Sequence, residues 1–292
     1  MTKKRASAIS LVLMLAFCFL VSTGCNATKE TVASKDGKII IAVTVLPQKA
    51  LVEAVCGDLG EVVAMVPPGN SPGNYEPTPM AMEKFSKASI FFTIGVPTET
   101  ANILPKATDM KVVKLQEKVA AKYPDREFAP GKRDPHIWLS PKRAKTMVEV
   151  IAQEMSSLDE KNKNTYQKNA QTYIEELDKL DKDIKTTFEG VKNKKFIVFH
   201  PAYGYLADDY GLQMVELEQD GKEATPQHLQ EVIDLAKKEN LKVIFSQAEI
   251  DSKQPEAFAE EIGGKKVQLD PLSENYIPNL KNMTKSIVEA MK

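Results

Sequence analysis

Short runs of β-branched and aromatic residues alternate with longer amphipathic stretches from Lys38 to the end of the chain. Each run is bounded by Gly, Pro or polar residues, a pattern typical of buried strands that alternate with helices in a parallel sheet. The runs are IIIAVTV, VVAMV, IFFTI and KVVKL in the first half, and FIVF, QMVEL, LKVIF and KVQL in the second. We therefore expect an α/β fold of two similar lobes, each with a four-stranded, mostly parallel sheet and flanking helices.

A helical pattern separates the two groups of strands. Ser140 and Pro141 predict a helix start, because the Ser hydroxyl caps free N–H groups and Pro lacks only an N–H that would be unpaired there. A second helix is predicted from about Asp159 to Gly190, where apolar residues recur every three or four positions. At about 1.5 Å per residue it would be a rigid rod of roughly 45 Å that joins the two lobes. Its apolar face comprises Tyr166, Ala170, Tyr173, Leu177, Leu180, Ile184 and Phe188.

The start of the chain has the organisation of an export signal. A basic cluster at residues 3–5 precedes an apolar run, residues 9–21, which is too short to span a bilayer comfortably and is followed by small residues. Cys25 follows a glycine, as in a bacterial lipoprotein cleavage box, although Ser22 stands where that box usually has Leu. We expect residues 1–25 to form a lipoprotein signal peptide in which Cys25 is lipidated and becomes the new N-terminus; the alternative is an ordinary signal peptide with a chance cysteine.

The rest of the chain divides into four segments. Residues 26–37 are polar and predict a flexible tether between the membrane and the folded part. We expect an N-terminal lobe over residues 38–157, a linking helix over residues 158–190 and a C-terminal lobe over residues 191–292. The folded part would therefore lie outside the cytoplasm, anchored to the cell membrane by lipid.

Charge and cysteine content exclude several classes of protein. The chain has 39 Lys and Arg against 40 Asp and Glu, and the leader holds three of the basic residues and no acid, so the mature chain carries a net charge of −4. Nucleic acid is excluded as a partner, because its phosphates demand clustered Lys and Arg. Only Cys56 lies beyond Cys25. A disulfide scaffold and a cysteine zinc cluster are therefore excluded as well.

Two histidines and one carboxylate are candidate ligands. His200 ends the strand FIVF, Asp270 ends the strand KVQL, and His136 lies in DPHIWLSP just before the helix that starts after Ser140. Ligands of open α/β sheets bind at the carboxyl ends of strands, so these side chains are expected at one edge. Singly, each is explained as a hydrogen-bonded loop residue or a turn-forming Asp. Together they suit Zn²⁺ or Mn²⁺. His228, in a predicted first helical turn, is expected to face solvent.

Several motifs occur in an order that resembles a known family. They are IIIAVTVLP, VPPGNSPGNYEPTP, DPHIWLSP, FHPAYGYLADDYGL, FSQAEIDSK and LDPLSENY, and they cover nearly the whole mature chain. In these motifs the chain is similar to the solute-binding lipoproteins of bacterial zinc and manganese ABC importers (metal-binding solute-binding protein family 9, cluster A-I). The resemblance implies two lobes bridged by a long helix, and a monomer that hands one Zn²⁺ or Mn²⁺ ion to a membrane permease with its ATPase. It places three family ligands on His136, His200 and Asp270.

The chain departs from the family at the first metal ligand. Where the family usually reads His, any residue, Tyr, Glu, Pro, this chain reads GNYEP from Gly73, which has no side chain to coordinate. The fourth position is left to water, to Asn74 or to Glu249. A missing imidazole favours ions that accept oxygen ligands, such as Mn²⁺, over closed tetrahedral Zn²⁺. The histidine-rich loop of many zinc-importing relatives is also absent, and that stretch reads KYPDREFAPGKR.

Two other functions compete with metal import. Three protein ligands and an open position are also the arrangement of a catalytic zinc, for example in a hydrolase. No HExxH or comparable motif supplies a general base, so we expect no enzyme activity. A relative that has lost metal binding could instead capture another solute or act as a surface adhesin. The ligand residues favour the importer subunit.

Overall fold

The computed structural model describes residues 37–219 and 221–292. The predicted leader with Cys25, and all of the predicted tether except Gly37, lie outside these residues. Within the described residues, no helix has the length and hydropathy needed to cross a bilayer.

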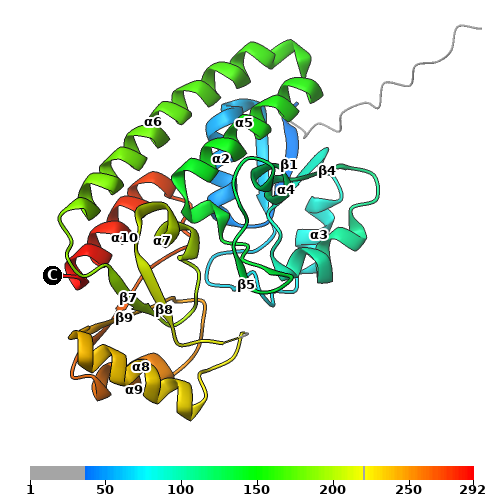
Figure 1. The fold of residues 1–292 in the computed structure, drawn as a ribbon. Coiled ribbons are helices and arrows are strands. Elements are labelled where there is room, and N and C mark those ends of the chain that lie inside the picture. The colour runs from blue at the N-terminus through cyan, green and yellow to red at the C-terminus, as the bar shows by residue number, and fades with distance from the viewer. Residues whose placement is uncertain (1–36, 220) are drawn as a thin grey trace, which may run out of the picture. The chain divides into compact units, whose positions relative to one another are not determined.

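Two four-stranded parallel sheets form the framework of the fold (Figure 1). The N-terminal sheet has the strand order β2-β1-β3-β4, and the C-terminal sheet has the order β10-β9-β7-β8. Every pairing in both sheets is parallel, so the carboxyl ends of the four strands lie along one edge of each sheet. The predicted fold class is confirmed. The strands are β1 (Ile39–Val43), β2 (Gly60–Ala64), β3 (Ile90–Thr93), β4 (Lys111–Lys114), β7 (Lys195–Val198), β8 (Gln213–Glu216), β9 (Val243–Ser246) and β10 (Lys265–Gln268).

Helices connect the strands, and polar caps mark several of their starts. At the start of the helix Pro141–Leu158, the Ser140 hydroxyl accepts a hydrogen bond from Arg143 N. At the start of the helix Pro226–Glu239, the Thr225 hydroxyl accepts one from His228 N. A proline follows each capping residue. The helices are α2 (Leu46–Cys56), α3 (Pro79–Phe85), α4 (Leu115–Ala120), α5 (Pro141–Leu158), α6 (Lys163–Glu189), α7 (Gly204–Tyr210), α8 (Pro226–Glu239), α9 (Gln254–Glu261) and α10 (Tyr276–Ala290). A short antiparallel hairpin, β5 (Glu127–Ala129) and β6 (Lys132–Arg133), occupies the stretch KYPDREFAPGKR.

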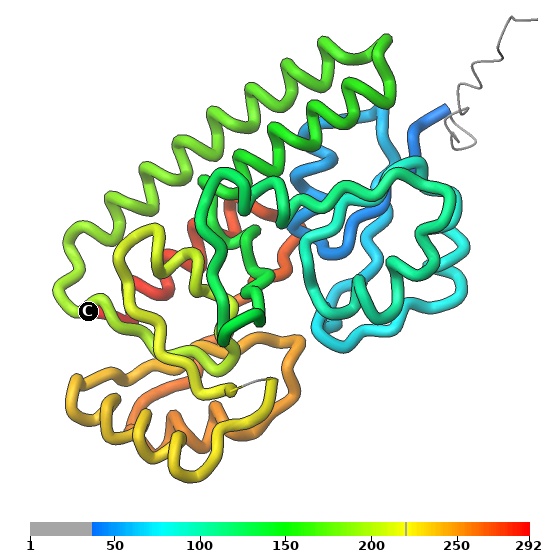
Figure 2. The backbone as a smooth tube through the Cα atoms, turned by 45° about the vertical axis from the view of Figure 1, so that its right-hand side comes forward, coloured from blue at the N-terminus to red at the C-terminus, as the bar shows by residue number. Residues whose placement is uncertain are grey.

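The long helix α6 lies against elements from both halves of the chain. It spans 27 residues, about 40 Å at 1.5 Å per residue. It runs beside α5 in both views (Figures 1 and 2), and it also contacts α2, α7 and α10. All seven residues of the predicted apolar face are buried, or in the case of Tyr173 half-buried against the core. The prediction of a long helix with this face is confirmed.

One hydrophobic core runs continuously through both halves of the chain. In β7, Phe196 and Val198 face this core, while Ile197, together with Phe199 just after the strand, faces a second, smaller core. The alternation is that of a parallel strand buried on both faces. In Figure 1, α8 and α9 cover the outer face of the C-terminal sheet, and α7 and α10 lie on its other side. The shared core therefore fixes the C-terminal strands relative to α5 and α6.

Candidate metal centre

His136 and His200 meet although 64 residues separate them along the chain. His200 lies just beyond β7, and His136 immediately precedes the short 3-10 helix η4 (Ile137–Leu139). Their Nε2 atoms are 3.3 Å apart, and their ring planes are inclined at 76°. The side chain of His136 is 9% exposed and that of His200 is 24% exposed, so the pair is open to solvent mainly on the His200 side.

The Nδ1 atom of each imidazole lies within hydrogen-bond distance of a buried carboxylate. His136 Nδ1 lies 2.7 Å from Asp134 Oδ1, and His200 Nδ1 lies 3.0 Å from both carboxylate oxygens of Glu218. A carboxylate can only accept, so each Nδ1 carries the hydrogen and each Nε2 presents a lone pair toward the other ring. The backbone N–H of His136 also donates to Asp134 Oδ1 at 3.0 Å. These bonds hold both rings in the orientation that a metal ligand needs.

The spacing of the two Nε2 atoms matches that of a zinc complex. Two nitrogens bound at about 2.0–2.1 Å to a tetrahedral zinc ion lie about 3.3–3.4 Å apart. The 3.3 Å separation therefore allows both rings to bind one ion with little movement. Burial lowers the pKa of His136, an effect larger than the opposite influence of Asp134. The ring is thus neutral at pH 7 and can accept a cation without first losing a proton.

Two further carboxylates follow strands of the same sheet. Glu249 lies beyond β9, and Asp270 lies beyond β10. Asp270 is exposed, and its Oδ1 accepts a hydrogen bond from Leu272 N at 3.0 Å. Burial and, more weakly, the charge of Asp270 raise the pKa of Glu249. Among the described residues, the buried Oε2 of Glu249 has no hydrogen-bond partner. An acceptor without a donor suits a cation.

The candidate ligands form two pairs and no larger group. Within residues 37–219 and 221–292, no three His, Cys, Asp or Glu side chains lie close enough together to hold one ion. The structure brings His136 into contact with His200. It also places Asp270 near enough to Glu249 to raise the pKa of Glu249. The histidine pair and the carboxylate pair do not form one cluster among the described residues. The role of Asp270 as a ligand beside the histidines stays a prediction.

Gly73 and Asn74 lie at the exposed end of the loop that precedes α3. The carbonyl oxygen of Tyr75 in this loop accepts hydrogen bonds from Thr98 Oγ1 at 2.6 Å and from Asn102 Nδ2 at 2.8 Å. The loop is thereby attached to the segment that follows β3. Coordination by Asn74 stays a prediction.

A buried glutamate anchors the segment that holds this loop. Glu99 begins the π-helix η2 (Glu99–Ile103) and is 1% exposed. Its carboxylate accepts hydrogen bonds from the N–H groups of Ile94 and Gly95, both at 2.8 Å, and from the hydroxyl of Thr44. Burial nevertheless raises the pKa of Glu99 to about 7. The anchor lies at the carboxyl ends of β1 and β3, the position at which open α/β sheets bind ligands.

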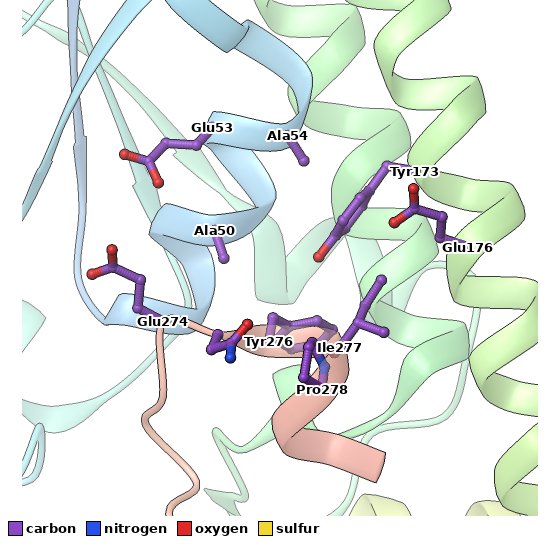
Figure 3. Close-up of a pocket in the computed structure, with 10 residues that line it drawn as sticks. Ala50, Glu53, Ala54, Tyr173, Glu176, Glu274, Tyr276, Ile277 and Pro278 are labelled. Carbon is purple, nitrogen blue, oxygen red and sulfur yellow. The ribbon is translucent and has the colours of Figure 1, made fainter. Parts of the chain in front are cut away.

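A depression of about 580 Å³ is lined by other residues (Figure 3). Helices α2, α6 and the start of α10 form it, and the hydroxyl of Tyr173 points into it. Glu274 at this site pairs with Lys49, with Nζ and Oε2 3.2 Å apart. Because no predicted ligand lines the depression, it is distinct from the histidine pair.

Sequence reasoning missed the two carboxylates behind the histidines. Asp134 lies two residues before His136, a spacing at which a short acidic side chain reaches the backbone N–H of residue i+2, so the motif DPH is a usable signal. Glu218 lies 18 residues from His200 and follows a different strand, so no local pattern connects them. The expectation for His228 was wrong: its side chain is half-buried, and Nε2 donates to the carbonyl oxygen of Glu216 at 3.0 Å.

One protein-family model matches nearly all of the residues that the structure describes. Residues 41–290 match the family described as zinc-uptake complex component A, periplasmic. The chain belongs to this family. The match spans both sheets, the long helix and the histidine pair.

Curated relatives agree with the family match. The chain is 30% identical over 279 residues to the high-affinity zinc uptake system protein ZnuA of Bacillus subtilis (strain 168), covering 89% of this chain and 87% of that protein. It is 30% identical over 305 residues to the zinc-binding lipoprotein AdcA of Streptococcus pneumoniae (strain ATCC BAA-255 / R6), covering 94% of this chain but only 60% of AdcA. It is 28% identical to the iron ABC transporter substrate-binding lipoprotein MtsA of Streptococcus pyogenes serotype M1, covering 87% of this chain and 86% of MtsA.

Solved structures share the fold. The crystal structure of a ZnuA protein matches with a TM-score of 0.82 and 33% identity, covering 87% of this chain and 100% of that chain. The periplasmic zinc-binding protein TroA from Treponema pallidum matches with a TM-score of 0.80 at 20% identity, over 87% of this chain and 99% of that chain. The second match shows the fold alone. Together they confirm the arrangement of two sheets and a long helix.

We predict that Asp134→Asn lowers zinc affinity about 10- to 100-fold, the usual effect of removing a partner behind a metal-binding imidazole. The amide can present an N–H to Nδ1 of His136, so the ring is no longer held with its lone pair on Nε2. Competition with a chromogenic chelator measures the affinity. The control is Glu231→Gln, which alters a carboxylate 3.8 Å from His228 and should leave zinc affinity unchanged. Equal affinities of Asp134→Asn and the parent protein would contradict the role of Asp134.

We predict that Glu99 makes the protein less stable as pH rises through neutrality. Its pKa rises from an ordinary 4.5 to about 7 in the folded protein. The contribution of Glu99 to the free energy of unfolding is therefore complete below pH 4.5 and is lost as pH rises through about 7. Glu99→Gln should remove this part of the pH dependence. Thermal unfolding between about pH 5 and about pH 8 tests it, with Glu76→Gln, an exposed glutamate, as control. The idea fails if the parent and Glu99→Gln curves run parallel.

Proposed function

We propose that this chain is the extracytoplasmic metal-binding subunit of an ABC importer, which captures one divalent transition ion and delivers it to a membrane permease with its ATPase. The observation that carries the proposal is the 3.3 Å separation of the Nε2 atoms of His136 and His200. Each ring is fixed by a carboxylate on Nδ1, so both lone pairs are directed at one point. Membership of the zinc-uptake family supports the same function.

We propose Zn²⁺ as the ion that the histidine pair selects, with Mn²⁺ as its competitor. Neutral imidazoles at tetrahedral spacing suit zinc, whereas the absence of an imidazole at Gly73 admits oxygen ligands and higher coordination. Asp270 is the proposed third ligand. The fourth position falls to Asn74, Glu249 or water, and the unpartnered Oε2 of Glu249 supports the second of these.

The proposed domain organisation follows the sequence prediction. Residues 38–157 and 191–292 form the two lobes, and residues 158–190 form the linking helix. The relatives AdcA and MtsA are named as lipoproteins, which supports a signal peptide over residues 1–25 and anchoring through Cys25. The mature protein is proposed to act as a monomer.

Enzyme activity and adhesion are the alternatives. The family is defined by zinc uptake, which supports a binding protein without catalysis. One solved relative, from Streptococcus agalactiae and 25% identical, is described as a bifunctional protein with adhesin and metal-transporting activity. Nothing in the described residues singles out an adhesive surface on this chain, so metal import is the function that we propose.

The proposed function predicts that the purified protein binds one zinc ion and that His200→Ala abolishes tight binding. Removing one imidazole leaves a single nitrogen ligand of the pair, which is a poor site for zinc. Isothermal titration with Zn²⁺, and competition with Mn²⁺, measures stoichiometry and preference. The matched control is His228→Ala, which removes a half-buried histidine hydrogen-bonded to a carbonyl. Unchanged stoichiometry and affinity in His200→Ala would overturn the proposal.

The same titration on Gly73→His tests the fourth position. Gly73 does not have a positive φ, and an added Cβ meets only Ser71 Oγ at 3.4 Å, so the loop can accept a side chain. We expect zinc affinity to rise markedly while manganese affinity changes less, because the new imidazole completes a nitrogen-rich site. An unchanged zinc affinity would show that another residue fills the fourth position or that this loop does not reach the ion.

Lipidation predicts that the protein is recovered with membranes and that Cys25→Ser releases it. A basic cluster, an apolar run and small residues precede Cys25, and stable anchoring takes more than one acyl chain. Fractionation of cells, with mass spectrometry of the mature N-terminus, measures both. A mature N-terminus at another residue, without lipid, would reject the anchor.

A further inference from the structure

The hairpin before His136 is closed at its neck by a side chain from the other half of the chain. Within the neck, Asp134 N donates to the carbonyl oxygen of Arg126 at 2.8 Å. The hydroxyl of Tyr205, on α7, then bridges both neck residues. It accepts from Arg126 N at 3.0 Å and donates to the carbonyl oxygen of Asp134 at 3.0 Å. Tyr205 is buried, and its hydrogen bond to Asp134 is buried, whereas the bond from Arg126 N is partly buried.

The side chain of Arg126 makes a second connection to α7. Its Nη1 lies 3.0 Å from both carboxylate oxygens of Asp208, and its Nε lies 3.5 Å from Asp134 Oδ2. Gly204, the first residue of α7, makes room for this arrangement, because a Cβ there would stand 2.1 Å from Arg126 Nε. Arg126 therefore links the carboxylate that holds His136 to the helix that follows His200.

A third connection lies on the far side of His136. Trp138 Nε1 donates to the carbonyl oxygen of Pro271 at 2.8 Å, next to Asp270. His136 thus stands between two attachments to the part of the chain that carries the C-terminal sheet, one through α7 and one through the segment after β10. Although His136 comes from the first half of the sequence, its position is set by the second half.

We propose that Tyr205 and Arg126 are positioning residues of the metal site, which clamp the segment of residues 126–136 to α7 and so hold His136 against His200. Neither is a ligand. The clamp keeps the histidine pair together. This inference rests on the proposed function for its effect on metal binding, but its structural part can be measured without metal.

The first test compares Tyr205→Phe with Tyr210→Phe. Both tyrosines lie on α7 and both hydroxyls form hydrogen bonds, but Tyr210 bonds to Asp181 of α6 at 2.7 Å and not to the hairpin. In metal-free protein, Tyr205→Phe should speed amide hydrogen exchange at Arg126, whose N–H loses its acceptor, while Tyr210→Phe should not. Zinc affinity should fall about 10-fold or more in Tyr205→Phe, the size of effect seen for outer partners of metal ligands.

The second test displaces the guanidinium without removing any polar group. Gly204→Ala should push Arg126 away from Asp134 and lower zinc affinity as Arg126→Gln does. The controls are Gly190→Ala, where an added Cβ meets nothing within 4 Å, and Arg133→Gln, which breaks the pair of Arg133 with Asp125 on the same hairpin. Measuring thermal stability in parallel separates positioning from unfolding: a positioning role lowers affinity in variants that remain fully folded at the assay temperature.

The outcomes distinguish the clamp from the proposed function. If the parent protein binds no metal ion, the proposed function fails, yet faster exchange at Arg126 in Tyr205→Phe still supports the clamp. If the parent binds zinc and Tyr205→Phe, Gly204→Ala and Arg126→Gln bind it as tightly, the clamp does not position the site and the inference is overturned. Unchanged exchange at Arg126 in Tyr205→Phe overturns it independently of metal.

Discussion

Each sheet of this protein packs one face into a hydrophobic core that the two halves of the chain share. A parallel sheet is buried on both sides, and in β1 and β7 alternate side chains enter different cores. Helices α5, α6 and α10 complete the core that the two sheets share. Helix α6 packs against both α5 and α10. Because that core is continuous, the strands of the C-terminal sheet hold a fixed position relative to the helices of the first half. The histidine pair depends on this constraint.

The chemistry of the site follows from what ends each strand of the C-terminal sheet. His200 follows β7, Glu218 follows β8, Glu249 follows β9 and Asp270 follows β10. His200 and three carboxylates therefore follow the four strands of one sheet, and His136 comes from the other half of the chain to meet His200. Carboxylates behind the rings orient the Nε2 lone pairs, while burial keeps His136 neutral. Two Nε2 lone pairs that face each other at 3.3 Å repel, and a cation bound between them would remove this repulsion.

The two sheets are connected by more than the long helix. A rod packed along both halves restricts their relative motion, as its continuous apolar face indicates. The bonds of Tyr205 to the hairpin neck and of Trp138 to Pro271 add connections close to the site. By contrast, Gly73 and Asn74 lie on an exposed loop anchored to the N-terminal sheet through Thr98 and Asn102. The least constrained part of the candidate site is therefore the position where the family ligand is missing.

Periodicity and capping in the sequence were sufficient for the strands, the long helix and the helix starts at Pro141 and Pro226, because such patterns depend on residues within a few positions of one another. They also pointed to His200 and Asp270, which follow buried strands, and to His136, which lies just before a predicted helix start, because such positions are visible in the local sequence. The partners of these residues were not visible. Glu218 and Tyr205 reach the site across 18 and 71 residues of chain, and the preference for such contacts arises from packing of the shared core. Local sequence specifies which elements form, whereas the burial of their common faces decides which side chains meet.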